Sequence, residues 1–245
     1  MRLFQVIRLG QRAAARTAVC VLGLGAVLSL DSALSMTASM LVSVAIYAVA
    51  FGWKFACGFV VLLFVHEFGH LLASKIVGLK SSKPLFIPFL GAVIRIQEPL
   101  NAKMEANVAI GGPALGTLSA LVCLIFYLWD DDVLFLVLSY TACLLNLFNM
   151  IPCSPLDGGK IAAAISPHMW WIGCLITGAL FLFTKNIFLM LILAFSLLKL
   201  WGGEEATDPA YYKLSLRQRL TVAWWYFGLL IVLGVLAYYL VAAIH

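Results

Sequence analysis

Long apolar runs separated by short polar breaks dominate the chain. A helix of about 20 residues spans the roughly 30 Å of bilayer hydrocarbon, so each long run is a candidate span. The runs predict helices near 34–51, 55–77, 104–128, 133–150, 168–184, 186–201 and 221–243. A shorter run at 17–30 could be a short span, a half-helix or an interfacial segment. The pattern therefore predicts an all-α polytopic membrane protein with about 6–8 transmembrane helices.

The composition agrees with this class. Hydrophobic residues make up 64% of the chain and charged residues 11%, whereas soluble domains are about half apolar and a quarter charged. The lipid bilayer is thus the expected surrounding. The formal net charge of +5 is best used as a topology signal, because no segment resembles a nucleic-acid-binding surface, and no nucleic acid is expected as a partner.

Two polar breaks differ from ordinary loops. SSKPLFIPFLGAVIRIQEP at 81–99 is rich in β-branched and aromatic residues and is interrupted by prolines and a glycine. This pattern predicts short extended strands, a small membrane-associated β element that could offer a sheet edge at the membrane surface. NMIPCSPLDGGK at 149–160 contains two prolines and a Gly-Gly pair, which predicts irregular backbone. Such backbone is tolerated at membrane depth where it is buried in protein or lines a wet cavity.

The apolar run at 55–77 contains the pentapeptide HEFGH, with His66, Glu67 and His70. Ionisable groups in hydrocarbon are expensive unless they have partners, so the motif indicates a function. Two histidines four residues apart share one helix face and can bind one metal ion. Glu67 lies close enough to take a proton from an activated water. The alternative, a structural pair of histidines, would leave three ionisable groups without partners.

A zinc site needs a third protein ligand and leaves one position open for water. Asp157 is the best source, because it lies in the irregular segment and no other acid occurs between Asp132 and Glu204. The residues alone equally allow Asp157 to be the N-cap of a following helix, GGKIAAAI. Cys153 is a rival third ligand, since a thiolate also suits zinc, although the prolines around it favour a packed turn residue.

Three segments resemble the signatures of the site-2 protease family of intramembrane zinc metalloproteases, and in particular its bacterial branch of sporulation-factor-processing proteases. These segments are HEFGH at 66–70, GGPA at 111–114 and NMIPCSPLDGG at 149–159. The resemblance covers roughly residues 35–201. It implies that His66, His70 and Asp157 bind Zn2+, that Glu67 is the catalytic base, and that Asn149 helps to hold the substrate backbone or the oxyanion. The same asparagine could simply bond its own helix backbone.

The resemblance implies a function, and the segments on either side of it complete the expected domain organisation. The function is hydrolysis of peptide bonds in transmembrane protein substrates by a zinc-activated water, with Glu67 as general base. The organisation is an N-terminal basic segment with a short hydrophobic run at 1–33, an intramembrane metalloprotease core at 34–201, and a connecting segment with an extra transmembrane helix at 202–245. No segment is long enough for the PDZ or nucleotide-sensing domain of some relatives, so substrate selection is expected from the membrane domain or a regulatory membrane partner. A catalytically inactive membrane scaffold and a metal-binding transporter are the alternatives.

Positive charges predict the orientation, because excess Lys and Arg in short loops marks the cytoplasmic side. Basic residues flank the HEFGH helix at 75–103, crowd the N-terminus and surround the connection at 202–219, whereas three consecutive acids occupy 130–132. The active site is therefore expected to open toward the cytoplasm of a bacterial cell membrane. This orientation needs an even number of crossings before the loop at 78–103, which favours 17–30 not spanning the membrane on its own.

Overall fold

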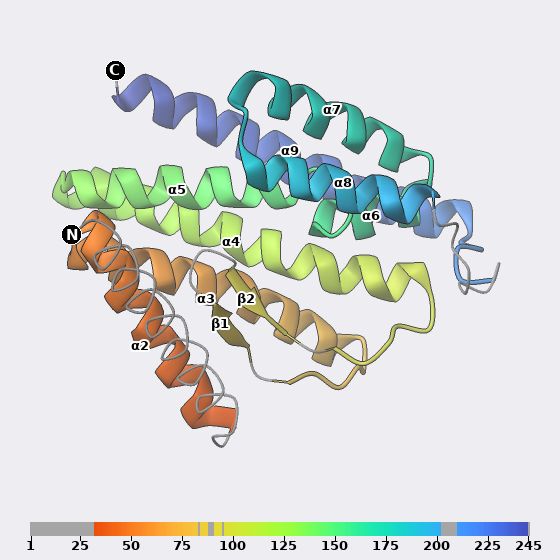
Figure 1. The fold of residues 1–245 in the computed structure, drawn as a ribbon, viewed down its shortest axis with the longest axis horizontal. Helices are drawn as coiled ribbons and strands as arrows, with labels where there is room; N and C mark the ends of the chain where they lie inside the picture. The colour runs from red at the N-terminus through yellow and green to blue at the C-terminus, as the bar shows by residue number, and fades with distance from the viewer. Residues whose placement is uncertain (1–31, 83, 88–90, 95, 202–209, 245) are drawn as a thin grey trace, which may run out of the picture.

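The computed structural model describes residues 32–82, 84–87, 91–94, 96–201 and 210–244. The predicted run at 17–30 and most of the predicted N-terminal segment lie outside these residues. Within them the chain forms helices and one small hairpin (Figure 1). The elements are α2 (Ser32–Phe51), α3 (Trp53–Ile76), β1 (Leu85–Ile87), β2 (Gly91–Val93), α4 (Ala102–Asp130), α5 (Val133–Asn149), α6 (Asp157–Ile165), α7 (Met169–Thr184), α8 (Ile187–Trp201) and α9 (Leu216–Ile244).

The predicted fold class is confirmed. Each of the seven long apolar runs forms a helix, and six of these helices lie within two residues of the predicted bounds at both ends, a difference usual for helix ends. The seventh, α9, begins five residues before its predicted start. Four of these helices, α2, α3, α4 and α9, are long and apolar enough to cross a membrane, and α5, α7 and α8 are shorter apolar helices. The chain is thus a multi-pass membrane protein.

Helix α4 occupies the middle of the molecule and contacts α3, α5, α6 and α9 (Figure 1). Its approach to α3 is close because small residues face each other: a methyl group on Gly69 would lie 2.1 Å from the carbonyl oxygen of Gly111. Small residues let helix backbones pack together in membranes. The GGPA segment therefore serves close packing of α4 against the histidine-bearing helix.

The predicted β element is also present. Strands β1 and β2 form an antiparallel pair in which Phe86 lies opposite Ala92. The pair lies beside α2 and α3 (Figure 1), and the Phe86 amide donates a hydrogen bond to the Ser39 hydroxyl of α2 at 3.1 Å. The Phe86 side chain is buried. Helix α2 thus holds the β1 side of the hairpin, and β2 forms its other side.

Candidate metal centre

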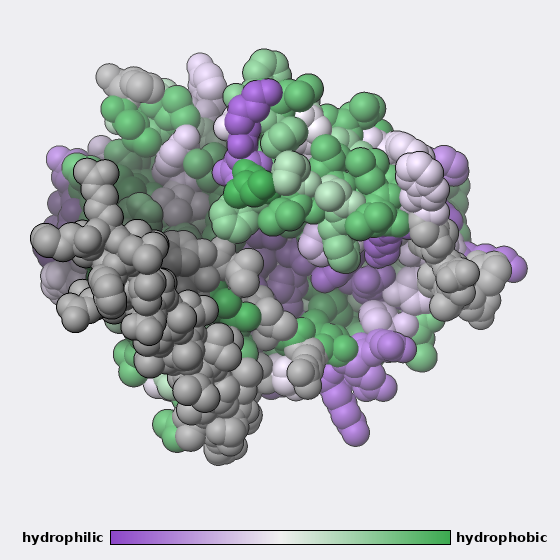
Figure 2. All heavy atoms as spheres, in the orientation of Figure 1, coloured by the Kyte–Doolittle hydropathy of each residue, from purple (hydrophilic) through white to green (hydrophobic). Residues whose placement is uncertain are grey.

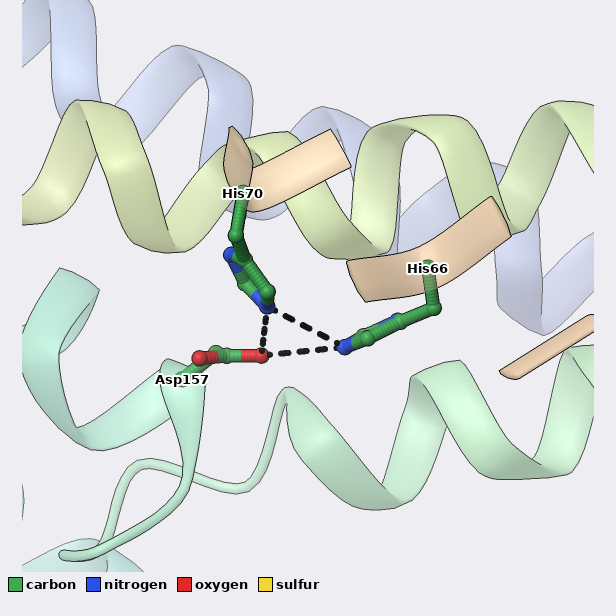
Figure 3. A group of neighbouring side chains, drawn as sticks. All are labelled: His66, His70 and Asp157. Atoms are coloured by element: carbon green, nitrogen blue, oxygen red, sulfur yellow. Dashed lines mark hydrogen bonds and ion pairs between the residues drawn. The ribbon is translucent and has the colours of Figure 1, made fainter. Parts of the chain in front are cut away.

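Three side chains converge in the interior between α3 and the start of α6. His66 and His70 point from one face of α3 toward Asp157, as Figure 3 shows. The two Nε2 atoms lie 3.3 Å apart, and Asp157 Oδ2 lies 3.3 Å from His66 Nε2 and 3.2 Å from His70 Nε2. All three residues are buried. Their three ligand atoms form a nearly equilateral triangle. Among the described residues, His66, His70 and Asp157 form the group of histidine, cysteine and acidic side chains that could hold a metal ion.

The triangle fits zinc. A tetrahedral site with bond lengths of about 2.0–2.1 Å to nitrogen and oxygen has ligand-to-ligand separations of roughly 3.3 Å. The three observed separations, 3.2 to 3.3 Å, match this value. Two imidazoles and one carboxylate also form a ligand set that zinc enzymes use, with a fourth position left for water or substrate. The donor set and its spacing therefore suit a catalytic rather than a closed structural zinc site.

Hydrogen bonds on the far side of each imidazole fix its orientation. His70 Nδ1 lies 2.9 Å from the Val108 carbonyl oxygen, which can only accept, so Nδ1 carries the proton and the Nε2 lone pair faces the triangle. His66 Nδ1 lies 2.9 Å from Oδ1 of Asn146, whose amide nitrogen donates to the Ala142 carbonyl at 2.7 Å. Both histidines are thus held as metal ligands usually are, with the second nitrogen bonded to an acceptor.

Asn146 was not predicted from the sequence. It is a polar residue in the apolar helix α5, 80 positions from His66, and only its burial at 1% exposure and its bond to His66 show its role. Gly116 of α4 makes room for it, since a methyl group there would lie 2.1 Å from the Asn146 amide oxygen. An amide side chain within a mostly apolar helix was the available signal.

We expect replacement of Asn146 by leucine to weaken zinc binding by about 10–100-fold, the range for loss of an outer-shell partner of a metal ligand. The leucine has a similar volume but cannot accept a hydrogen bond from His66 Nδ1, so the imidazole loses its fixed tautomer. Zinc affinity measured by competition with a chelator checks this. Thr141→Val, at a half-buried position on the same helix, should leave the affinity unchanged; equal affinities for both variants would contradict the assignment.

The glycines of α4 also leave the space that the imidazoles occupy. A methyl group on Gly112 would lie 2.3 Å from His70 Nε2 and 2.8 Å from His66 Nε2. No side chain larger than hydrogen fits there without moving a histidine. The second glycine of the GGPA segment therefore belongs to the wall of the metal centre as well as to the helix packing.

A cavity of about 660 Å³ opens beside the three side chains. Figure 2 shows hydrophilic side chains recessed between apolar surfaces in the middle of the molecule. The cavity is lined by α3, the segment between β2 and α4, α4 itself, α5 and the start of α6. Its lining includes Glu67, Ile94, Ile96, Glu105, Asn149 and Lys160. Glu67 thus faces the same space as the metal-binding group without belonging to it.

The other sequence candidates lie in distinct places. Asp157 is the first residue of α6, and the capping position is Leu156, which makes no side-chain cap, so the N-cap alternative for Asp157 is wrong. Cys153 is buried away from the triangle, with its sulfur 3.3 Å from the Thr177 hydroxyl. Asn149 lines the cavity, and its amide donates to the Leu145 carbonyl at 3.1 Å.

Lys160 is a cavity residue that the sequence did not single out. Its ammonium lies 3.8 Å from Asp157 Oδ1, whereas Oδ2 of the same carboxylate faces the histidines. It follows Asp157 by three positions, which places both side chains on one face of α6. That spacing was the signal in the sequence.

Comparison with known proteins agrees with the site. The model of the family described as "Peptidase family M50" matches residues 54–132. A zinc metalloprotease of Methanocaldococcus jannaschii is 36% identical over 114 residues, which cover 43% of this chain and 33% of that protein. The "Probable zinc metalloprotease EGY2, chloroplastic" of Oryza sativa subsp. japonica is 28% identical over 224 residues, which cover 69% of this chain and 40% of that protein.

A solved structure is also similar. The "Site-2 Protease from Methanocaldococcus jannaschii" is 26% identical to this chain, covers 69% of it and 88% of its own length, and superposes with a TM-score of 0.44. The chain spans a third to two fifths of the length of the curated relatives above. The family match begins at the second residue of α3, includes the HEFGH motif and the GGPA segment, and ends just after α4. Over these residues the chain is therefore similar to peptidase family M50, whose named relatives here are zinc metalloproteases.

Proposed function

We propose that the protein is an intramembrane zinc metalloprotease that hydrolyses peptide bonds in transmembrane protein substrates. In this proposal His66, His70 and Asp157 hold zinc and Glu67 is the general base. The observation that carries it is the buried triangle of three ligand atoms, all 3.2 to 3.3 Å apart, with Glu67 lining the same cavity. A purely structural cluster would have no need of a carboxylate facing that space.

The roles of the side chains follow from their positions. Zinc, when bound, supplies a Lewis acid that makes water nucleophilic near neutral pH. Glu67 accepts the proton as the water attacks the scissile carbonyl and then returns it to the leaving amine. Asn149 and the ammonium of Lys160 line the cavity and can donate hydrogen bonds to the oxyanion that develops on the carbonyl.

The hairpin is suited to hold an unwound substrate. A peptide bond within a helix has its carbonyl already bonded and its faces shielded, so a transmembrane substrate must unwind locally before cleavage. An extended segment regains its backbone hydrogen bonds by adding to a sheet edge. The β1 side is occupied by α2 through Ser39, whereas the chain that continues β2 lines the cavity with Ile94 and Ile96. We therefore assign the substrate edge to the β2 side.

The proposal extends to the cellular setting. The motif likeness to bacterial sporulation-factor-processing proteases and the placement of basic residues support a bacterial cell membrane. Substrate choice is assigned to the membrane domain together with a regulatory membrane partner. The curated relatives are archaeal and chloroplast proteins, and they support the family but not this branch.

Metal analysis and a cleavage assay on the purified protein test the function together. We expect about one zinc per chain and cleavage of a reconstituted transmembrane reporter that stops on chelation and returns when zinc is added. Metal flux into proteoliposomes without cleavage would favour a transporter. Neither zinc nor cleavage would favour an inactive scaffold and overturn the proposal.

The orientation is a separate prediction. If the loop after α3 is cytoplasmic, a single cysteine at Lys80 is shielded from an impermeant thiol reagent added outside the cell. A cysteine at Asp130, at the opposite end of α4, should then react. Both positions are exposed in the structure, and the native cysteines are replaced in both variants. Labelling at Lys80 but not at Asp130 would reverse the orientation while leaving the chemistry of the site unaffected.

A further inference from the structure

Helix α9 lies outside the region that resembles the family, yet it packs into the core around the metal centre. Its buried residues recur every three or four positions and so share one helix face. They are Val222, Tyr226, Leu229, Leu233, Leu236 and Leu240. This face contacts α4, α5 and α6, and the Leu233 carbonyl accepts a hydrogen bond from Cys143 of α5. Helix α9 is therefore a wall of the core.

Tyr226 bonds the segment that leads to Asp157. Its side chain is 2% exposed, and its hydroxyl donates to the Met150 carbonyl at 2.8 Å. The same carbonyl is in contact with the residue after Asp157, because a methyl group on Gly158 would lie 2.2 Å from the Met150 oxygen. One peptide carbonyl is thus held between the Tyr226 hydroxyl and the first turn of α6, directly beside the carboxylate-bearing residue.

Arg219 holds the opposite end of α6. The last carbonyls of a helix have no partners within it, and a cation there is favourable. The Arg219 guanidinium donates to the carbonyls of Ala164 and Ile165. It also donates to the carbonyl of Tyr212 at 2.8 Å, so α6 is tied to the segment that precedes α9.

Helix α6 is short enough for these two contacts to determine its position. Its nine residues span only about 13 Å, with Asp157 at one end and the Arg219 contacts at the other. Tyr226 and Arg219 both lie outside the lining of the cavity. Their effect on the site must therefore pass through the backbone of α6 and the segment before it.

We propose that Tyr226 and Arg219 are positioning residues that hold Asp157 at the metal distance from His66 and His70. This inference rests on the proposed function, because it takes Asp157 as a zinc ligand. The histidines are fixed separately by α4 and α5. Helix α9 supplies the corresponding support for the third ligand.

Conservative variants of the whole 245-residue chain test the inference. Tyr226→Phe removes only the hydroxyl. Arg219→Lys keeps the charge but loses the planar guanidinium, whose N–H groups donate to several carbonyls. We expect each change to raise the zinc dissociation constant about 10-fold, the lower end of the range for outer-shell partners. The visible absorption of the Co2+-loaded protein should also change, because it reports ligand geometry and does not depend on activity.

Matched variants separate positioning from general stability. Tyr238→Phe and Arg217→Gln alter exposed positions of α9 and should change neither zinc affinity nor the Co2+ spectrum. Leu240→Ala removes a fully buried side chain near the far end of α9 and should lower the thermal midpoint with zinc affinity retained. An unchanged zinc affinity and spectrum in Tyr226→Phe, or an equal loss of affinity in Leu240→Ala, would overturn the inference. Absence of zinc binding by the unmodified chain would overturn the proposed function itself, which distinguishes the two failures.

Discussion

Glu67→Gln is expected to abolish peptide cleavage while zinc stays bound and the fold stays intact. The amide is nearly isosteric with the carboxylate but cannot accept the proton of the attacking water. A general base typically contributes about 10²–10⁴-fold to the rate, so the cleavage rate of a transmembrane reporter should fall by at least that range. Retained zinc is expected because Glu67 lines the cavity but is not part of the His66, His70 and Asp157 group.

Rate and metal content must be measured on the same preparation. Glu98→Gln makes the same change at an exposed position in the loop before α4 and should cleave at the unmodified rate. Cleavage retained in Glu67→Gln would remove Glu67 from the mechanism. Loss of zinc in that variant would instead make Glu67 a ligand, in conflict with the triangle formed by the other three side chains.

The apolar runs predicted the helices well because the bilayer requires long uninterrupted apolar segments. Errors occurred at the helix ends, because local polar contacts determine at which residue a helix begins or ends. Helix α4 begins at Ala102 rather than near 104, because the Asn101 side chain accepts a hydrogen bond from the Met104 amide. The β hairpin was also predicted, since prolines and alternating residues exclude a helix there.

The metal centre was predictable only in part. The spacing of His66 and His70 is a local helical property, and so their shared face followed directly from the sequence. Asp157 could equally have been a cap when judged from the sequence alone, and only the fold brings its carboxylate to the histidines. Asn146 belongs to no recognised motif, and its contact with His66 depends on how α5 packs against α3 and α4.

The contacts of α9 with α6 could not be predicted from the sequence for the same reason. Its apolar run predicted a transmembrane helix, but the run does not say which face is buried or against what. The hydroxyl of Tyr226 and the guanidinium of Arg219 are recognisable as contacts to α6 and its preceding segment only once the helices are packed. Long-range hydrogen bonds of single polar residues leave no periodic pattern to detect.

Asp157→Ala is expected to remove most of the zinc from the purified protein. With the carboxylate gone, two imidazoles remain, and catalytic zinc sites use three protein ligands. The loss of affinity should exceed the roughly 10–100-fold that follows loss of an outer-shell partner, and cleavage should disappear with the metal. Zinc content after dialysis against a weak chelator, measured by atomic emission, checks this.

Cys153→Ser is the matched variant, because it alters the rival ligand in the same irregular segment. The Cys153 sulfur contacts the Thr177 hydroxyl, buried away from the triangle, and serine can keep that hydrogen bond. Zinc content and cleavage should therefore remain near those of the unmodified protein. The reverse pattern, with zinc lost in Cys153→Ser and kept in Asp157→Ala, would assign the third ligand to the thiolate and require the PLDGG segment to turn its other side toward the histidines.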